Sequence, residues 1–251
     1  MFSDIQRIYD VHETVHGFPR MLGSIDCTHW EWTNCPTAWR GQHQRGNHSH
    51  PTLILEAVAS YDLWIWHAFF GVAGANNDIN VLDQSPIFDD IIDGVAPGSS
   101  FIVNNVEYEH VYYLADGIYP EYATFVKAYT SPIGEKRELF KKAQESARKD
   151  IERAFRVFKK KWAMIKNLCR IWTKEKIRNV MYTCIILHNM ILEDKGLAVC
   201  QNYDDNPHMT PAQLSSEEKH AIRNALRDRD THLSLHGDLT EDIWTNCTSD
   251  D

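Results

Sequence analysis

The chain lacks the features of a zinc-ribbon, secreted or membrane protein. Its six cysteines form no Cys-x-x-Cys pair, the spacing that zinc ribbons and redox motifs use. It has no run of 18 apolar residues long enough to span a membrane, and no secretory signal at its start. It also lacks internal repeats. We therefore expect a protein of a reducing, intracellular compartment with no membrane partner.

Positive charge is scarce outside one segment. The formal net charge is −9, yet residues 136–178 contain 16 Lys and Arg against 5 Asp and Glu. A basic block in an acidic protein indicates an anionic partner, although a solvated helix face explains the same pattern equally well. Side chains in this block that are candidates for DNA phosphate contacts are Arg153, Arg156, Lys159, Lys160 and Lys161.

Apolar periodicity predicts alternating strands and helices. Aromatic and β-branched runs separated by short polar turns indicate strands, and apolar residues every three or four positions indicate helices. The expected elements are a strand at 21–26, a hairpin of 53–60 and 64–72 turning at Tyr61-Asp62, a helix after Asn76-Asn77-Asp78, strands within 101–115 turning at Asn104-Asn105, and helices at 135–166 and 174–193.

The helix expected at 135–166 has a clear apolar face. Its stripe consists of Ile151, Ala154, Phe155, Phe158, Trp162 and Ile165. Glu152 falls at the edge of this stripe, where a side chain can face a cleft while its neighbours are buried.

This order of elements predicts one α/β domain, a mixed sheet flanked by helices, over residues 21–194. Residues 1–20 form a short leading segment. Residues 195–251 are expected to be an acidic, flexible tail, because residues 193–251 hold 13 Asp and Glu against 5 Lys and Arg. One helix is expected in the tail near 215–229, with Ser215-Ser216 as its cap.

Three carboxylates stand in settings suited to metal-dependent chemistry. Asp26 and Asp116 each end an apolar run, and Glu152 follows Asp116 with 35 residues between them. Two acids at strand ends and one on a helix can converge on hard cations such as Mg²⁺ or Mn²⁺, which also bind phosphate oxygens. Taken singly, each has a simpler explanation: a turn residue for the aspartates, and an ion pair with Arg148 or Arg156 for Glu152.

Asp78 is a fourth candidate ligand. It precedes an apolar segment, so it could instead cap the following helix through its side-chain oxygen. Asn77 is available as the cap if Asp78 binds metal. The sequence leaves both alternatives open.

Five blocks resemble the PIF/Harbinger-type plant transposases and their domesticated relatives. The blocks are GSIDCTHWEW, LEAVASYDLWIWHAFFGVAGANNDINVL, YYLADGIYP, ARKDIERAF and MYTCIILHNMILED, in that order. The resemblance implies an RNase H-like nuclease core with Asp26, Asp116 and Glu152 as the catalytic Asp-Asp-Glu set, two divalent metal ions, DNA as substrate and a nuclear location. It further implies a separate DNA-binding protein of the Myb-like type as a partner, and it permits an oligomer.

The chain departs from the family pattern at one position near the catalytic glutamate. Relatives usually have Gly where this chain has Arg156, one helical turn beyond Glu152. Arg156 could contact DNA, or it could form an ion pair with the Glu152 carboxylate.

Outside the basic block, Trp39-Arg40 is the best candidate for stacking on DNA bases.

Two functions are consistent with these residues. The first is a metal-dependent DNA endonuclease or strand transferase. The second is a domesticated, catalytically silent protein that keeps the fold and binds other proteins or chromatin. An intact set of acids permits the first function without establishing it.

Overall fold

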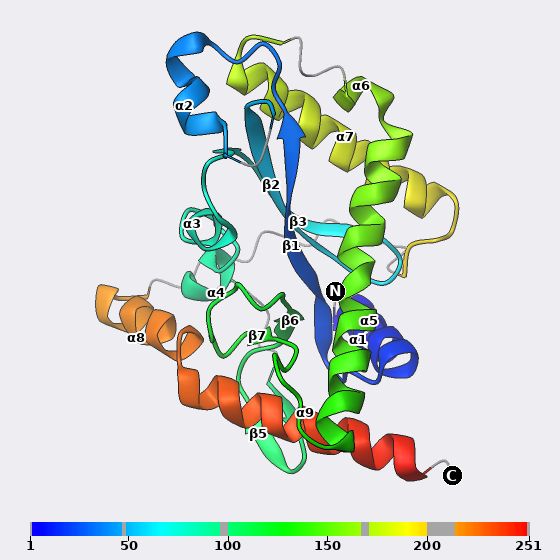
Figure 1. Cartoon of the computed structure of the whole chain (residues 1–251). Helices are drawn as coiled ribbons and strands as arrows, with labels where there is room; N and C mark the ends of the chain where they lie inside the picture. The colour runs from blue at the N-terminus through cyan, green and yellow to red at the C-terminus, as the bar shows by residue number, and fades with distance from the viewer. Residues whose placement is uncertain (1, 47–48, 96–99, 167–170, 200–213, 250–251) are drawn as a thin grey trace. The chain divides into compact units, whose positions relative to one another are not determined.

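The chain forms an α/β fold with a mixed five-stranded sheet (Figure 1). A computed structural model describes residues 2–46, 49–95, 100–166, 171–199 and 214–249. The strand order of the sheet is β3-β2-β1-β6-β7, and β4 and β5 form a separate two-stranded sheet. The pairs β1/β6 and β6/β7 are parallel, whereas β2/β3 is antiparallel. The predicted α/β class with a mixed sheet is thus confirmed.

The strands and helices that the sequence predicts are present, together with several that it does not predict. The strands are β1 (Met21–Glu31), β2 (Thr52–Ala59), β3 (Ile65–Ala73), β4 (Phe101–Val103), β5 (Val106–Tyr108), β6 (Tyr112–Leu114) and β7 (Phe125–Val126). The helices are α1 (Phe2–His16), the short 3-10 turn η1 (Thr37–Trp39), α2 (Arg40–His43), α3 (Asp78–Leu82), α4 (Asp89–Ile92), α5 (Glu135–Lys161), α6 (Ala163–Lys166), α7 (Lys174–Asp194), α8 (Ser216–Leu226) and α9 (Arg229–Ser249).

The chain divides into two compact units. The first unit comprises Met1–Ser24, Pro86–Lys149 and Val199–Asp251, and the second comprises Ile25–Ser85 and Asp150–Ala198. The division falls inside β1 and again inside α5, so each of these elements contributes to both units. The single domain that the sequence predicts over residues 21–194 stays a prediction.

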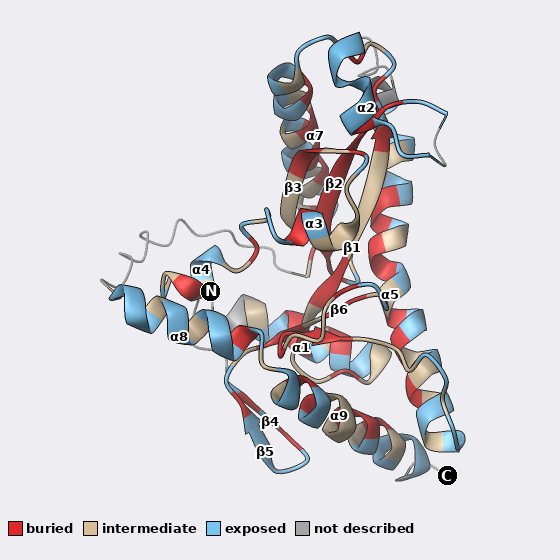
Figure 2. Ribbon diagram, turned by 60° about the vertical axis from the view of Figure 1, so that its left-hand side comes forward, coloured by how far each residue is buried: buried red, intermediate tan, exposed pale blue. Residues whose placement is uncertain are grey.

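The first unit has its own apolar core. Met21 of β1, Tyr112 and Leu114 of β6, Phe140 of α5 and Leu239 of α9 are buried together in it (Figure 2). The parallel pairing of β1 with β6 aligns Ser24 with Leu114, and β6 aligns in turn with β7. These strands bury both faces, which explains why they read as short continuous apolar runs.

The hairpin of β4 and β5 confirms the turn predicted at Asn104-Asn105. Both asparagines have positive φ angles, 51° and 64°. Two consecutive residues in this region form the hairpin turn whose twist matches that of the flanking strands, and asparagine tolerates the conformation better than most residues.

The C-terminal region differs from the expected flexible tail. α8 begins after a capping box in which Ser215 and Glu218 bond each other's backbone N–H groups, as the sequence predicts near this position. α9 then follows as a full helix. It buries Leu235, Leu239 and Ile243, three residues four positions apart, against β4 and β7. This narrow stripe is hidden in the sequence by the polar residues between its members.

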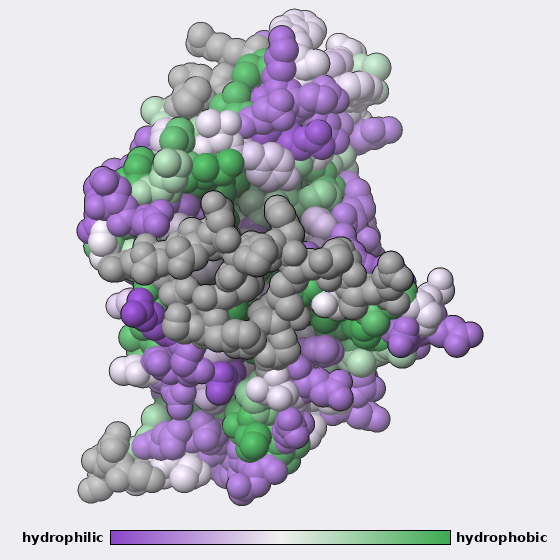
Figure 3. Space-filling model, turned by 180° about the vertical axis from the view of Figure 1, so that it is seen from behind, coloured by the Kyte–Doolittle hydropathy of each residue, from purple (hydrophilic) through white to green (hydrophobic). Residues whose placement is uncertain are grey.

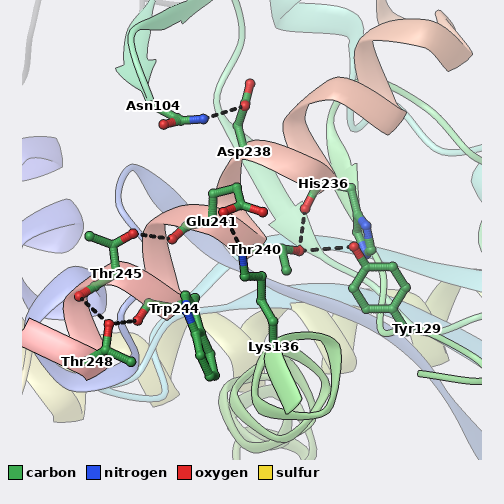
Figure 4. Close-up of polar contacts among 10 residues, drawn as sticks. All are labelled: Asn104, Tyr129, Lys136, His236, Asp238, Thr240, Glu241, Trp244, Thr245 and Thr248. Carbon is green, nitrogen blue, oxygen red and sulfur yellow. Dashed lines mark hydrogen bonds and ion pairs between the residues drawn. The ribbon is translucent and has the colours of Figure 1, made fainter. Parts of the chain in front are cut away.

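Polar contacts also attach α9 to the first unit (Figure 4). Lys136 Nζ donates to Glu241 Oε2 at 2.6 Å, and Asn104 Nδ2 donates to Asp238 Oδ1 at 3.0 Å. The hydroxyls of Tyr129 and Thr240 lie 3.1 Å apart. The helix is therefore held by buried apolar groups and by bonds at its edges.

Acidification should destabilise the first unit through His236. Burial lowers the pKa of His236 to about 4, and its Nε2 lies 2.7 Å from the Lys127 carbonyl oxygen. Between pH ~6.5 and 4 the unfolded chain therefore binds more protons. Stability from this group is present above pH ~6.5 and falls as the pH decreases toward 4, by up to about 1.4 kcal/mol per pH unit.

Thermal melting across this pH range measures the effect. The variant His236→Gln should show a flatter decline in Tm than the wild type, because glutamine can still donate to the carbonyl but cannot be protonated. His220→Gln, at an exposed position of α8, is the matched control. Equal pH profiles for His236→Gln and the wild type would contradict the prediction.

The second unit is built on the β2/β3 hairpin. The hairpin aligns Leu53 with Ala73 and Ala59 with Ile65, and turns at Tyr61-Asp62 as predicted. One face of the hairpin packs against α5 and α7, where Phe158 and Met181 are fully buried. The other face packs against α3 (Figure 1).

The apolar stripe of α5 is confirmed. Ile151, Ala154, Phe155 and Phe158 are buried in the core of the second unit, and Ile165 is buried beyond the end of the helix. The expected continuous helix is interrupted at Trp162, between α5 and α6.

α7 is apolar on more than its buried side. Met181, Cys184 and Ile185 face the core, but Ile186 and Met190 are exposed. Figure 3, which views the molecule from behind, shows hydrophobic atoms at the surface in its upper half. None of the described helices combines the length and apolarity needed to cross a membrane.

Candidate functional site

Asp26 lies in the middle of β1 and is half-buried. Its Oδ1 accepts a hydrogen bond from the Cys27 backbone N–H at 2.8 Å. Successive strand residues point to opposite sides of a sheet, so Asp26, Thr28 and Trp30 share one side. Trp30 packs into the core with α5. The Asp26 side of β1 is therefore the side that α5 covers in the second unit.

Lys159 connects α5 to this side of β1. Its Nζ donates to Thr28 Oγ1 at 2.6 Å, approaches the His29 carbonyl oxygen at 3.5 Å, and lies 4.7 Å from the centre of the Trp30 ring. Burial lowers the pKa of Lys159. The sequence predicts a phosphate-binding role for this lysine, whereas the structure turns it inward against the strand.

Glu152 is half-buried on the same side of α5 as Lys159. Seven positions separate them, which is two helical turns and returns to nearly the same direction. The Lys159–Thr28 contact therefore orients the Glu152 side of α5 toward the Asp26 side of β1. Both acids belong to the second unit.

Asp116 belongs to the first unit and follows the end of β6. Its Oδ1 accepts from the Ile118 backbone N–H at 2.5 Å, so the side chain closes a local turn across Gly117. The strand end is anchored by Gln144 of α5, whose Nε2 donates to the carbonyl oxygens of Ala115 and Val126, each at 3.0 Å. Asp116 is thus a turn residue, as the simpler explanation of the sequence has it. Only one of its two carboxylate oxygens takes part in this turn.

Asn77, and not Asp78, caps α3. The Asn77 side chain accepts from the Asn80 backbone N–H at 2.8 Å, and Asp78 is the first residue of the helix. Of the two alternatives that the sequence leaves open for Asp78, capping is therefore wrong. Metal binding by Asp78 stays a prediction.

Carboxylate oxygens are suitable ligands for Mg²⁺ and Mn²⁺, and all four candidate acids are partly accessible to solvent. However, across the described ranges no three His, Cys, Asp or Glu side chains are grouped so as to hold a metal ion. The four candidate acids therefore have the right ligand type for Mg²⁺ or Mn²⁺. That Asp26, Asp78, Asp116 and Glu152 meet at one metal site stays a prediction.

The basic side chains of α5 fall into two groups. Arg153 is occupied internally: it donates to Asp150 at 2.6 Å, a residue only 1% exposed, and its guanidinium lies 5.5 Å from the centre of the Tyr61 ring. Lys159 is occupied by β1. By contrast, Arg156, Lys160 and Lys161 are exposed.

Arg156 is exposed on α5, one helical turn beyond the half-buried Glu152. A helical ion pair of this spacing contributes only about 0.3–0.5 kcal/mol at an exposed position, and salt screens it further. Such a pair is too weak to keep a divalent cation or a phosphate from the two side chains. Both roles open to Arg156, a contact with DNA and an ion pair with Glu152, stay predictions.

Glu56 is a buried acid that no sequence motif marks as functional. It lies in the fully buried strand β2, and its Oε1 is 3.4 Å from His67 Nε2. Neither carboxylate oxygen has a hydrogen-bond partner among the described residues. The signal in the sequence is a single acid in the apolar run LILEAVAS. A buried carboxylate of this kind is costly unless a proton or a neighbouring charge compensates it.

Comparison with known proteins places the chain in a family. Residues 1–198 match the family described as plant transposon protein. A relative, the Protein ALP1-like of Arabidopsis thaliana, is 22% identical over 234 residues, covering 90% of this chain. The chain spans 58% of the length of that relative. No solved structure matches the chain. The match over 198 residues and the five blocks agree: the chain belongs to the plant transposon protein family, a transposase-derived family of the PIF/Harbinger type.

Proposed function

We propose that the chain is a DDE-type nuclease domain with an RNase H-like core, which cleaves or transfers phosphodiester bonds in DNA. Family membership and the mixed sheet with helices on its faces support the fold. The observation that carries the proposal is the contact between Lys159 and Thr28, which orients the Glu152 side of α5 toward the Asp26 side of β1.

The block YYLADGIYP supplies Asp116 as the third member. The resemblance to the PIF/Harbinger transposases implies that this acid acts with Asp26 and Glu152, and 35 residues lie between Asp116 and Glu152. We therefore assign catalysis to Asp26, Asp116 and Glu152.

The three acids, with Asp78 as a further ligand, would hold Mg²⁺ or Mn²⁺. When bound, such ions lower the pKa of water and neutralise charge on the phosphate oxygens. The residues of the chain bind the ions and fix the direction of the carboxylates: the Cys27 N–H orients Asp26, and the Ile118 N–H orients Asp116. Lys159 adds a half-buried positive charge on the Asp26 side of β1.

The proposed setting is nuclear, with DNA as the partner. Phosphate contacts position DNA without reading its sequence. The exposed Lys and Arg side chains of α5 therefore do not select the target sequence. A separate DNA-binding protein of the Myb-like type would supply it, and an oligomer would allow two DNA ends to be processed together.

Nicking of supercoiled plasmid DNA tests the function. We expect relaxed circles to form with Mg²⁺ or Mn²⁺ and none to form with EDTA. A folded protein that binds DNA but leaves the plasmid supercoiled under all metal conditions would refute the nuclease. It would favour the second hypothesis, a domesticated protein that acts through protein or chromatin binding.

DNA binding should depend on the exposed basic side chains of α5. It should not depend on Arg153 and Lys159, which bond Asp150 and Thr28. Replacing Arg156, Lys160 and Lys161 together with alanine should weaken duplex binding uniformly across sequences. It should also lower the slope of log K against log salt by about one for each phosphate that is no longer neutralised. Fluorescence anisotropy over a range of salt concentrations measures both quantities.

The control is a double replacement of Arg7 and Arg223 with alanine, since both are exposed outside the basic block. The control should leave the salt slope unchanged. An equal decrease in control and test variants would show that binding follows net charge and not the α5 surface.

A further inference from the structure

Trp39 and Trp172 are the most exposed tryptophans of the second unit. Trp39, at the end of η1, is 44% exposed, and Trp172, just before α7, is 68% exposed. They are more than 130 positions apart in the sequence. Exposing a ring of this size forgoes a large gain from burial, so a pair of exposed tryptophans needs a reason.

A third tryptophan brings the two together. Trp32 is buried, and its Nε1 donates to the carbonyl oxygen of Ile171 at 2.9 Å, directly before Trp172. The ring of Trp32 also lies 6.0 Å from the ring of Trp39. Trp32 therefore contacts Trp39 directly and holds the backbone next to Trp172.

His43 contacts Trp39 through its ring and through a hydrogen bond. The two rings are nearly parallel, at 23°, with centroids 6.3 Å apart, and His43 Nδ1 lies 3.0 Å from the Trp39 carbonyl oxygen. Burial is the main cause that lowers the pKa of His43, and the charge of Lys174 lowers it further. Lys174 therefore lies close to this cluster, at the start of α7.

The surroundings of the cluster are basic, although the chain as a whole is acidic. Residues 36–46 contain Arg40 and Arg45 and no acid. Residues 171–178 contain Lys174, Lys176 and Arg178 against one acid, Glu175. Arg40 and Lys176 are exposed. Aromatic planes bordered by cations form the usual surface for single-stranded nucleic acid.

We propose that Trp39 and Trp172, with Arg40, Lys174 and Lys176, form a binding surface for a single-stranded segment of DNA. Bases stack on the two tryptophans, and the cations contact the flanking phosphates. A duplex fits this surface less well, because its base faces are already stacked on each other. The surface goes beyond the proposed nuclease site and uses none of its acids.

Binding of a labelled oligonucleotide of about 12 nucleotides, within the usual footprint of a single-strand-binding fold, tests the proposal. The probe is single-stranded DNA, compared with a duplex of the same sequence, in EDTA at low salt so that no cleavage occurs. We expect tighter binding of the single strand. Trp39→Ala and Trp172→Ala should each weaken it by about tenfold, as expected for the removal of one stacked base. Phenylalanine at either position should retain most of the affinity.

Trp66→Ala is the matched control. Trp66 is 37% exposed in the same unit, but its Nε1 donates to Ser60 Oγ and its ring contacts Trp64. This variant should bind as the wild type does. If the Trp39 or Trp172 variants fail to fold, which far-ultraviolet circular dichroism reveals, the double charge reversal Arg40→Glu with Lys176→Glu replaces them, and it should lower the affinity at least as much.

Preference for the duplex, or unchanged affinity in folded variants, would overturn the proposal, as would an equal decrease in Trp66→Ala. Preferential capture of a peptide over the oligonucleotide would overturn it in favour of a protein partner. The oligonucleotide measurement needs no metal. If the oligonucleotide does not bind but the plasmid is still nicked, only the proposed single-strand surface is refuted. Failure of nicking with intact oligonucleotide binding would remove only the nuclease.

Discussion

Replacing Asp116 with asparagine should reduce metal-dependent nicking by at least about 10²–10³-fold, the decrease that follows removal of one preorganised electrostatic group from an active site. The substitution is chosen for its geometry. The asparagine side chain keeps an oxygen that can accept from the Ile118 N–H, so the turn at the end of β6 should survive. It lacks the negative charge that a divalent ion requires, so metal binding should be abolished while the fold is kept.

Nicking rates and melting temperatures, measured on the same preparations, separate these effects. Asp83→Asn, at an exposed position after α3, serves as the control and should nick at the wild-type rate. An Asp116→Asn protein that melts like the wild type and also nicks like it would show that Asp116 only closes its turn. In that case the assignment of the third acid would be wrong.

Phe158→Ala should cost about 3–5 kcal/mol of unfolding free energy, the range for truncating a buried phenylalanine. Phe158 is 0% exposed on α5. Its ring meets Trp30 edge-on at 6.0 Å and His188 at 5.6 Å, so it joins β1, α5 and α7 within one core. The alanine leaves a cavity that these three elements can close only by moving together.

Urea denaturation followed by tryptophan fluorescence measures this destabilisation, because Trp30 packs directly against the Phe158 ring. Val157→Ala, one position away and 39% exposed, should change stability by no more than about 0.5 kcal/mol. If both variants shift the midpoint equally, α5 does not pack on the second unit in the way the structure has it. The Phe158 cavity would also disturb Lys159 and the direction of Glu152, so nicking should fall together with stability.

Local signals in the sequence were sufficient for most elements. The strand periodicity and the Tyr61-Asp62 turn predict the β2/β3 hairpin, and Asn104-Asn105 predicts the turn between β4 and β5. The buried stripe of α5 follows from spacing alone. These features depend on residues a few positions apart, which is the range over which propensity, capping and turn chemistry act.

Features that depend on distant residues were not visible. The three apolar residues that dock α9 are separated by polar ones, so the stripe is recognisable only when β4 and β7 are seen beside it. Asn77 and Asp78 are equally good caps by type, and the backbone path into α3 selects Asn77. Neither outcome follows from composition.

The sequence by itself determined the family, most of the strands and helices between residues 21 and 194, and which acids are candidates for metal binding, because motifs and periodicity are properties of the chain read in order. Only the tertiary structure decided which basic side chains of α5 are exposed and which bond other residues of the chain. Lys159 and Lys160 are neighbours, yet one contacts Thr28 and the other is exposed; Arg153 holds the buried Asp150, whereas Arg156 faces solvent. One step along a helix turns a side chain by about 100°, and whether that direction meets a strand or water depends on what packs beside the helix.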